Sequence, residues 1–128
     1  MVIDTSALIA ILVGEAEADD FLQKIVQDPK LLVSAVTLVE SSIVIEARRG
    51  EAGGRELDLL LHRAQMRITP VDLEQAEMAR MAYRRFGKGR HPAGLNLGDC
   101  FSYALARISG EPVLAKGDEF RRAGLQIC

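Results

Sequence analysis

The chain has 128 residues, which is the size of one domain, and we expect a single domain over residues 1–128. Its hydrophobic content of 48% and charged content of 27% are ordinary for a globular protein with a normal core. The net charge of −2 excludes a general attraction to nucleic acid, and no apolar run approaches the roughly 20 residues of a membrane-spanning helix.

Short apolar runs alternate with amphipathic stretches along the chain. Strands are expected at residues 2–3, 31–33, 67–69, 113–115 and 125–127. Helices are expected at residues 5–13, 16–27, 36–49, 55–65, 72–86, 97–108 and 119–122. Gly50 should end the third helix, and Leu73, Tyr83 and Leu97 should face the core. Short all-apolar strands between helices predict an α/β fold with a parallel sheet covered on both faces.

The first residues place an acidic side chain at the end of a strand. Val2 and Ile3 are apolar β-formers that lead directly into Asp4, and Thr5 and Ser6 open the first helix. Ligands of parallel α/β proteins bind at the carboxyl ends of the strands. Asp4 is therefore either a helix cap or part of a site, and its position alone does not decide between the two.

Glu40 is the most informative acidic residue. It falls within the apolar stripe of its helix, which consists of Val36, Val39, Ile43, Val44 and Ala47. A lone carboxylate on a core-facing stripe costs several kcal/mol unless another group pairs with it. The alternative is a capping box in which Glu40 reaches back to the backbone of Thr37.

Asp99 and Asp118 each have an ordinary structural explanation as well as a functional one. Asp99 follows Asn96 in the first turn of its helix, where the two form a capping pair or Asp99 is a ligand. Gly98 leaves room for another group to approach. Asp118 follows a strand in a Gly-Asp turn, where an aspartate often caps a short helix.

Taken together, these four carboxylates are expected at one edge of the sheet if the first and fourth strands are neighbours. Carboxylates crowded there repel one another unless a divalent cation holds them. Oxygen ligands without a nearby histidine or cysteine suit Mg²⁺ or Mn²⁺ rather than zinc. Such a site supports displacement at phosphorus.

The cysteines and histidines do not indicate a zinc or redox site, and the beginning of the chain does not indicate a signal peptide. Cys100 and Cys128 have no redox or metal-binding spacing, and His62 and His91 lack partners at ligand spacing. The first strand begins at Met1 with no basic segment before it. We therefore expect a cytoplasmic protein.

Four motifs carry a resemblance to a known family. They are Met1–Leu8 (MVIDTSAL), Ser34-x-x-Thr37-x-x-Glu40, Leu95–Cys100 (LNLGDC) and Leu114–Phe120 (LAKGDEF). In this order and spacing they resemble the PIN-domain ribonucleases, and most closely the VapC toxins of bacterial toxin–antitoxin pairs. The resemblance spans nearly the whole chain, and the ordered set is specific although each motif alone is weak.

The resemblance implies a three-layer α/β/α sandwich and a Mg²⁺- or Mn²⁺-dependent endoribonuclease. Asp4, Glu40, Asp99 and Asp118 match the acidic positions of the family. Supporting roles fall to Asn96 and to Thr5 or Ser6, which match positions that often assist the acidic residues. The last motif often has two aspartates where this chain has Asp118-Glu119, so Glu119 is a weaker candidate.

The resemblance also implies partners. It predicts a homodimer and a cognate VapB antitoxin whose tail blocks the site. It also predicts an RNA substrate, for which tRNA and rRNA are candidates. A basic stretch before Asp99 could contact RNA phosphates or be a solvated loop; it includes Arg84, Arg85, Lys88 and Arg90.

Two other functions fit the acidic residues. In the first, Asp4 is the nucleophile of a phosphotransfer enzyme or receiver. In the second, all four acids are helix caps in a non-catalytic binding module. Binding of Mn²⁺ separates the nuclease from the module, and a trapped acyl-phosphate on Asp4 would indicate phosphotransfer.

Overall fold

The computed structural model describes residues 1–128 and contains one four-stranded sheet. Its strands are β1 (Val2–Ile3), β2 (Leu32–Ser34), β3 (Arg67–Thr69) and β4 (Val113–Leu114). They lie in the order β3-β2-β1-β4, and every pairing is parallel. The first and fourth strands are therefore neighbours, as the argument from the acidic residues requires.

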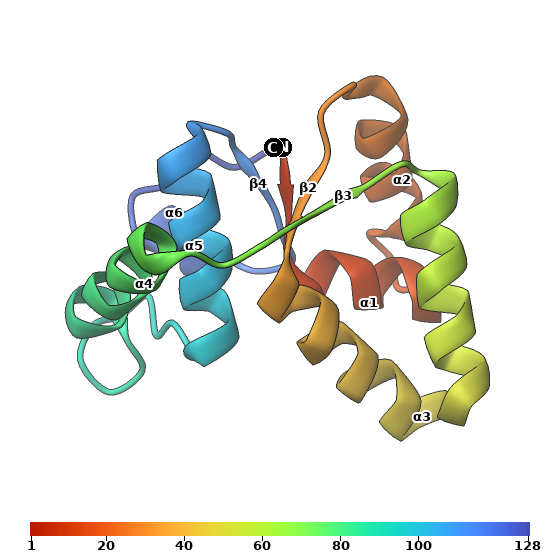
Figure 1. Cartoon of the computed structure of the whole chain (residues 1–128), viewed down its shortest axis with the longest axis horizontal. Helices are drawn as coiled ribbons and strands as arrows, with labels where there is room; N and C mark the ends of the chain where they lie inside the picture. The colour runs from red at the N-terminus through yellow and green to blue at the C-terminus, as the bar shows by residue number, and fades with distance from the viewer.

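Six helices cover the sheet, three on each face (Figure 1). They are α1 (Thr5–Val13), α2 (Ala18–Gln27), α3 (Ala35–Arg63), α4 (Leu73–Phe86), α5 (Leu97–Ser109) and α6 (Glu119–Arg122). Helices α1, α2 and α3 pack on one face, and α4, α5 and α6 on the other, so the predicted three-layer sandwich is confirmed. None of the helices is both long and apolar enough to cross a membrane.

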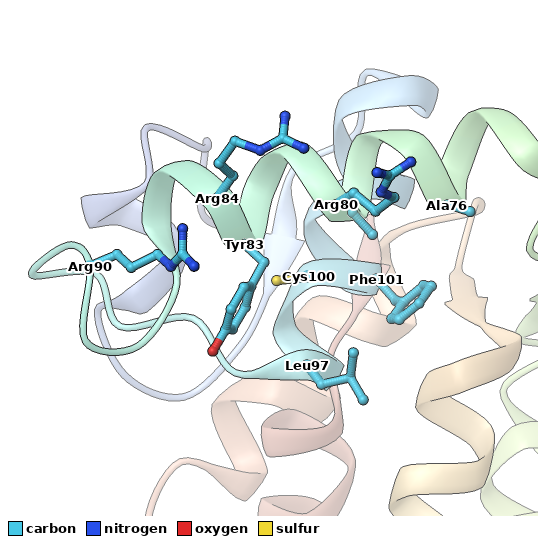
Figure 2. A pocket seen from close by; sticks show the side chains of 9 residues that line it. Ala76, Arg80, Tyr83, Arg84, Arg90, Leu97, Cys100 and Phe101 are labelled. Carbon is cyan, nitrogen blue, oxygen red and sulfur yellow. The ribbon is translucent and has the colours of Figure 1, made fainter.

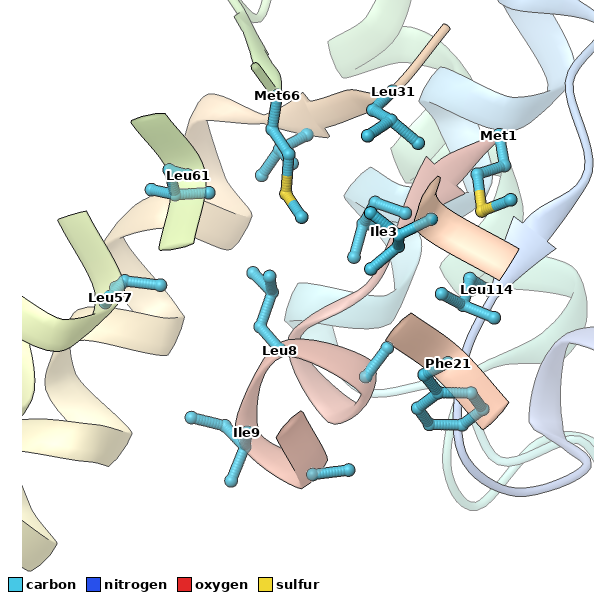
Figure 3. Close-up of a cluster of buried hydrophobic side chains, with 14 of the residues drawn as sticks. Met1, Ile3, Leu8, Ile9, Phe21, Leu31, Leu57, Leu61, Met66 and Leu114 are labelled. Carbon is cyan, nitrogen blue, oxygen red and sulfur yellow. The ribbon is translucent and has the colours of Figure 1, made fainter. Parts of the chain in front are cut away.

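Each strand contributes to two separate cores because successive side chains point to opposite faces of a sheet. Ile3, Val33 and Leu114 face α1, α2 and α3, where they pack with Leu8 and Phe21 (Figure 3). Their neighbours Val2, Leu32 and Val113 belong to the core on the α4, α5 and α6 side. Burial on both faces explains why these strands are apolar without alternation.

Most predicted boundaries agree with the structure within two residues, and two predicted elements differ more. Gly50 interrupts the third helix as expected, but the chain becomes helical again directly afterwards, so that α3 is one bent element that contains Gly53 and Gly54. The expected strand at 125–127 is reduced to a single bridge between Val113 and Ile127. It is too short to count as a fifth strand.

Candidate active site

The acidic residues meet where the strand order reverses. From β1 the chain continues to β2 on one side, while β4 lies on the other side of β1, and Asp4 directly follows β1. Helices diverge from the sheet at such a point and leave a crevice at the carboxyl ends of the strands. A cleft of about 310 Å³ lies there. It is lined by Asp4, Thr5, Ser6, Ile9, Glu15, Glu40, Val44, Asn96, Asp99 and Lys116.

Asp4 is both a helix cap and a side chain of this cleft. Its Oδ2 accepts hydrogen bonds from the Ser6 backbone N–H at 3.1 Å and from Ser6 Oγ at 2.8 Å. Its Oδ1 accepts a bond of 2.7 Å from Ser102 Oγ. Only 3% of Asp4 is exposed, so these bonds replace the water that a carboxylate normally requires.

Ser102 is a residue of the site that the sequence analysis missed. It is fully buried, and because its single hydroxyl proton is donated to Asp4, the 3.4 Å contact with Thr37 Oγ1 must be donated by Thr37. A polar chain therefore runs from Thr37 in α3 through Ser102 in α5 to Asp4. The available signal was a serine three residues after Asp99, which shares one side of the helix with it.

Glu40 is held by another element and does not cap its own helix. Ser34 caps α3, since Ser34 Oγ accepts a 3.2 Å hydrogen bond from the Val36 N–H. Glu40 Oε1 instead accepts a 2.5 Å hydrogen bond from Thr5 Oγ1 at the start of α1. The proposed capping box with Thr37 is therefore wrong, and Glu40 faces the cleft.

The apolar stripe around Glu40 does not face the core. Val39 and Ile43 are 58% and 64% exposed, and Ala47 is exposed too, whereas the buried side of this half of α3 consists of Thr37, Ser41 and Ile45. The small residues on that side allow α3 to pack against other helices. Glu40 therefore does not lie on a core-facing stripe, and that prediction is wrong. Glu40 nevertheless has the partner that was expected, since it accepts a hydrogen bond from Thr5.

Gly98 allows the first turn of α5 to approach Glu40. A Cβ atom on Gly98 would lie 2.1 Å and 2.4 Å from the two carboxylate oxygens of Glu40. No side chain larger than hydrogen fits there unless Glu40 moves. Gly98 was expected to let another backbone or a ligand come close, and the group that comes close is instead the Glu40 side chain.

Asp99 forms the predicted capping box with Asn96. Asn96 Oδ1 accepts a 2.8 Å hydrogen bond from the Asp99 N–H, and Asp99 Oδ2 accepts one of 3.0 Å from the Asn96 N–H. Burial, together with the negative charges of Asp4, Glu40 and Glu119, raises the pKa of Asp99 to about 7, against the lowering effect of the Asn96 bond. The charges of these three carboxylates therefore act on Asp99.

The structure does not bring Asp118 to the cleft. Its side chain is exposed and accepts a 2.7 Å bond from Arg121 Nη1, in an ion pair on α6. Glu119 is partly buried, and its charge is among the leading causes that raise the pKa of Asp99, whereas that of Asp118 is not. The structure thus brings together Asp4, Glu40 and Asp99 with Glu119 close by, and leaves Asp118 outside.

The same cleft contains a cation that the sequence analysis did not consider. Lys116 Nζ is paired with Glu15 and lies 3.7 Å from Glu17, and these contacts, led by the Glu15 hydrogen bond, raise the pKa of Lys116. Its backbone N–H donates to Ser6 Oγ at 3.0 Å. Lys116 thereby links the segment that follows β4 to the first turn of α1.

The donor atoms in the cleft fit a hard divalent cation. Asp4, Glu40 and Asp99 offer only oxygen, and no histidine or cysteine lines the cleft. Their mutual repulsion, seen in the pKa of Asp99, is what a cation would relieve. As placed, however, no three carboxylates converge closely enough to hold an ion, so binding requires at least one of them to turn.

The predicted basic stretch lies in the last turn of α4 and the loop that follows. Arg84, Arg85, Lys88 and Arg90 are all exposed, and none of the four forms a salt bridge. Their positive charge is therefore available to a partner.

Comparison with known proteins gives a consistent result. The PIN domain model matches residues 1–125. Ribonuclease VapC of Mycolicibacterium smegmatis is 59% identical over 121 residues, which cover 94% of each chain. Ribonuclease VapC30 of Mycobacterium tuberculosis is 54% identical over 125 residues, which cover 98% of this chain and 95% of that protein.

Solved structures agree on the fold. VapC20 of Mycobacterium tuberculosis, a toxin that cleaves the sarcin–ricin loop, superposes with a TM-score of 0.80 over 97% of this chain and 95% of its own, at 20% identity. VapBC2 of Rickettsia felis, solved with a DNA fragment from its promoter, gives 0.75 over 98% of this chain at 14% identity. With an acidic cleft at the strand reversal, full-length matches to the family model and relatives above 50% identity, this chain belongs to the PIN-domain family, among the VapC ribonucleases.

Proposed function

We propose that this chain is an endoribonuclease that requires Mg²⁺ or Mn²⁺, held by Asp4, Glu40 and Asp99. The observation that carries the proposal is the cleft that all three carboxylates line, where burial and the charges of Asp4 and Glu40 raise the pKa of Asp99 to about 7. A divalent cation bound there would stabilise the negative charge that develops on the scissile phosphate, and it would lower the pKa of a bound water to near neutral.

The protein contributes orientation and proton control. Ser6 and Ser102 fix both oxygens of Asp4, and Thr5 fixes one oxygen of Glu40. Asp99 must lose its proton to act as a ligand, because only the ionised carboxylate offers both oxygens. Attack by water at phosphorus breaks the P–O3′ bond and leaves a 3′-hydroxyl and a 5′-phosphate, without use of the RNA 2′-hydroxyl.

The two alternative functions fit the geometry less well. A phosphotransfer role requires Asp4 to attack phosphorus as a nucleophile, whereas only 3% of the residue is exposed and three accepted hydrogen bonds weaken its carboxylate as a nucleophile. A module in which every acid is a cap is inconsistent with Glu40, which caps nothing and turns towards α1. The nuclease uses each of these features.

At the last motif we propose that Glu119, rather than Asp118, assists Asp99. Glu119 is partly buried and its charge helps to raise the pKa of Asp99, whereas Asp118 forms an ion pair with Arg121 outside the cleft. If so, Glu119→Gln reduces RNA cleavage more than Asp118→Asn does. The reverse order would return the role to Asp118.

The test of the proposed function uses protein freed of metal with EDTA and a labelled RNA. Asp4→Asn and Asp99→Asn should each lower Mn²⁺-dependent cleavage by about 100-fold or more, since each removes a ligand of the cation. Calorimetry should show weaker Mn²⁺ binding by both variants. Asp58→Asn, on an exposed part of α3, is the matched control and should leave both properties unchanged. Full cleavage by Asp4→Asn would refute its role.

We also propose the partners that membership of the VapC ribonucleases suggests. A cognate VapB-type antitoxin neutralises the enzyme, and purification of the two proteins together should suppress cleavage. A homodimer is supported by exposed apolar side chains around a cavity of about 740 Å³ between α3 and α5. They include Val39, Ile43 and Leu97.

A further inference from the structure

A second cavity, of about 430 Å³, lies between α4 and α5. Its apolar lining includes Leu97, Cys100 and Phe101 of α5, and Figure 2 shows the Tyr83 ring standing over Cys100, between Arg90 and Leu97. Burial raises the pKa of Cys100 to about 11, so its thiol stays neutral and forms part of the apolar floor. Leu97 and Cys100 of this cavity and Asp99 of the acidic cleft lie in the same first turn of α5, so one turn of helix contributes to both.

Three guanidinium groups surround this apolar floor. Those of Arg80, Arg84 and Arg90 are spread around the rim (Figure 2). Arg80 is paired with Glu77 at 3.1 Å, but Arg84 and Arg90 form no salt bridge. Unpaired cations attract the phosphates of a polyanion. Such an attraction is needed beside the acidic cleft, because the carboxylates of the cleft repel phosphate groups.

The aromatic ring at the mouth of the cavity is only partly covered. Tyr83 is 41% exposed, which leaves part of its ring open to a stacking partner. The Arg90 guanidinium lies 5.8 Å from the centre of its ring. Cations beside an exposed aromatic ring on a positively charged surface are the elements that bind single-stranded nucleic acid.

We propose that this cavity binds one nucleobase of single-stranded RNA, stacked on Tyr83, with the adjacent phosphates on Arg84 and Arg90. This inference rests on the proposed nuclease function and adds to it a substrate subsite beside the reacting phosphate. Among the arginines that line the cavity, Arg84 and Arg90 are assigned to phosphates and Arg80 is paired with Glu77, so stacking on Tyr83 is the main contact with the base. The cavity therefore sets where the strand lies without selecting which base enters.

The favoured occupant is RNA rather than a protein segment. The apolar floor alone fits either one, but two unpaired arginines at its rim, with Arg85 and Lys88 close by in the sequence, favour a chain of phosphates. A protein that docked here would have to be acidic to match them. That outcome is distinguished by the experiment below.

The experiment measures binding in EDTA, where no metal-dependent cleavage occurs. The probe is a fluorescein-labelled single-stranded RNA of six nucleotides, followed by fluorescence anisotropy, together with versions that carry one abasic position in turn. Loss of one base should weaken binding by about tenfold at a single position, because stacking of that base is lost. An equal small effect at every position, or no binding of the RNA, would overturn the proposal.

Three variants locate the effect. Tyr83→Ala removes the ring, Arg84→Gln removes a cation of the rim, and Ala76→Leu fills the cavity without changing its charge. Each should weaken binding about tenfold, and Tyr83→Ala and Ala76→Leu should also abolish the sensitivity to the abasic position. Arg85→Gln is the matched control, because Arg85 carries the same charge next to Arg84 but does not line the cavity. It should keep that sensitivity.

The outcomes separate this subsite from the nuclease itself. If the cavity variants bind RNA as the unchanged protein does, while Asp4→Asn abolishes cleavage, the subsite is wrong and the nuclease stands. If the protein cleaves no RNA with Mn²⁺ but shows the abasic pattern in EDTA, the subsite stands alone. If the variants keep RNA binding but lose a dimer in sedimentation or lose the antitoxin, the cavity contacts protein and the proposal fails.

Discussion

The Asp4 carboxylate accepts three hydrogen bonds, from the Ser6 backbone, the Ser6 hydroxyl and Ser102. The bond from the Ser6 backbone caps α1, and the bond from Ser102 ties α1 to α5. A cap and a ligand are therefore compatible roles for one side chain, because a carboxylate has about four lone pairs and capping occupies only some of them. The same is true of Asp99, which remains in its capping box while facing the cleft.

Asp99 should make the stability of the metal-free protein depend on pH. Its folded-state pKa of about 7 lies above the usual 3.8, so the folded protein binds the proton more tightly than the unfolded chain does. The contribution of Asp99 therefore becomes less favourable as pH rises from about 4 to about 7, and the full penalty is present above pH 7.

Asp99→Asn removes this penalty and can still accept the capping bond. We expect it to stabilise the metal-free protein by about 1 kcal/mol at pH 8, allowing for screening by water, and by much less at pH 5. Urea unfolding at the two pH values measures the difference. An equal effect of Asp99→Asn at both values would contradict the raised pKa, and Asp58→Asn serves as control.

Gly98→Ala should separate activity from stability. The added Cβ would lie within 2.4 Å of both Glu40 oxygens, and since these are the end of a flexible side chain, Glu40 can turn away at small cost. Alanine favours a helix over glycine by about 1 kcal/mol. We expect unchanged or higher thermal stability with cleavage reduced by about tenfold or more, because Glu40 leaves its place.

Gly54→Ala is the control for this experiment. Its Cβ would lie 2.8 Å from the end of Glu46, which is also flexible, but this pair is exposed and outside the cleft. Stability should change as in Gly98→Ala, and cleavage should not change. Normal cleavage by Gly98→Ala would show that Glu40 is not required in its observed position.

At the scale of the elements, α3 determines how the site is enclosed. Its first half carries Glu40, and after Gly50 the chain turns back so that Leu57 and Leu61 enter the core with α1 (Figure 1). Arg49 donates hydrogen bonds to Leu12 O at 2.9 Å and to Glu56 at 3.0 Å, and so links the bend to α1. A straight α3 would place its second half in solvent.

Gly50→Ala should therefore destabilise the protein. Gly50 has φ 65° and ψ −159°, a conformation that is essentially restricted to glycine, and a Cβ there would touch nothing within 4 Å. The cost is thus conformational and should be about 1–3 kcal/mol in urea unfolding. Gly54→Ala lies in regular helix and should not lower stability. Equal stability of Gly50→Ala and the unchanged protein would mean that the bend does not depend on glycine.

At the scale of the whole molecule, helices on both faces of the sheet expose apolar residues that the sequence pattern places inside. Leu97 is 72% exposed, and Leu73 and Tyr83 are exposed as well, so the expectation that these three face the core is wrong. With Val39 and Ile43 of α3, Leu97 borders the cavity between α3 and α5. Exposed apolar side chains gathered around a cavity are typical of an interface.

If this surface forms the proposed homodimer, Ile43→Lys should convert a dimer into a monomer. Burying a lysine without a partner at an apolar contact opposes association. Analytical ultracentrifugation of the full chain measures the change, and circular dichroism checks that the fold is kept. Val26→Lys is the matched control, because Val26 is also an exposed β-branched residue, but it lies on α2 and does not line this cavity. A dimer that persists in Ile43→Lys would place the interface elsewhere.

Much of the fold can be predicted from the sequence because its local signals agree. Paired apolar residues at Val2–Ile3, Leu32–Val33 and Val113–Leu114 require burial on both faces, which only a parallel sheet between helices provides. The interruption at Gly50 and the capping box of Asn96 and Asp99 are likewise local, since backbone conformation and hydrogen bonds within one turn decide them.

What the sequence alone determined is thus the order of the elements, their caps and the acidic residues at the ends of the strands. Only the tertiary structure decided that Glu40 pairs with Thr5 and that Ser102 holds Asp4. It also decided that the charge of Glu119 acts on Asp99 while Asp118 pairs with Arg121, and that the Val39–Ile43 side of α3 faces outward. The physical reason is the range of the interactions involved. Caps and periodicity act within one or two turns, whereas these contacts join residues from different elements and depend on how helices pack across the sheet.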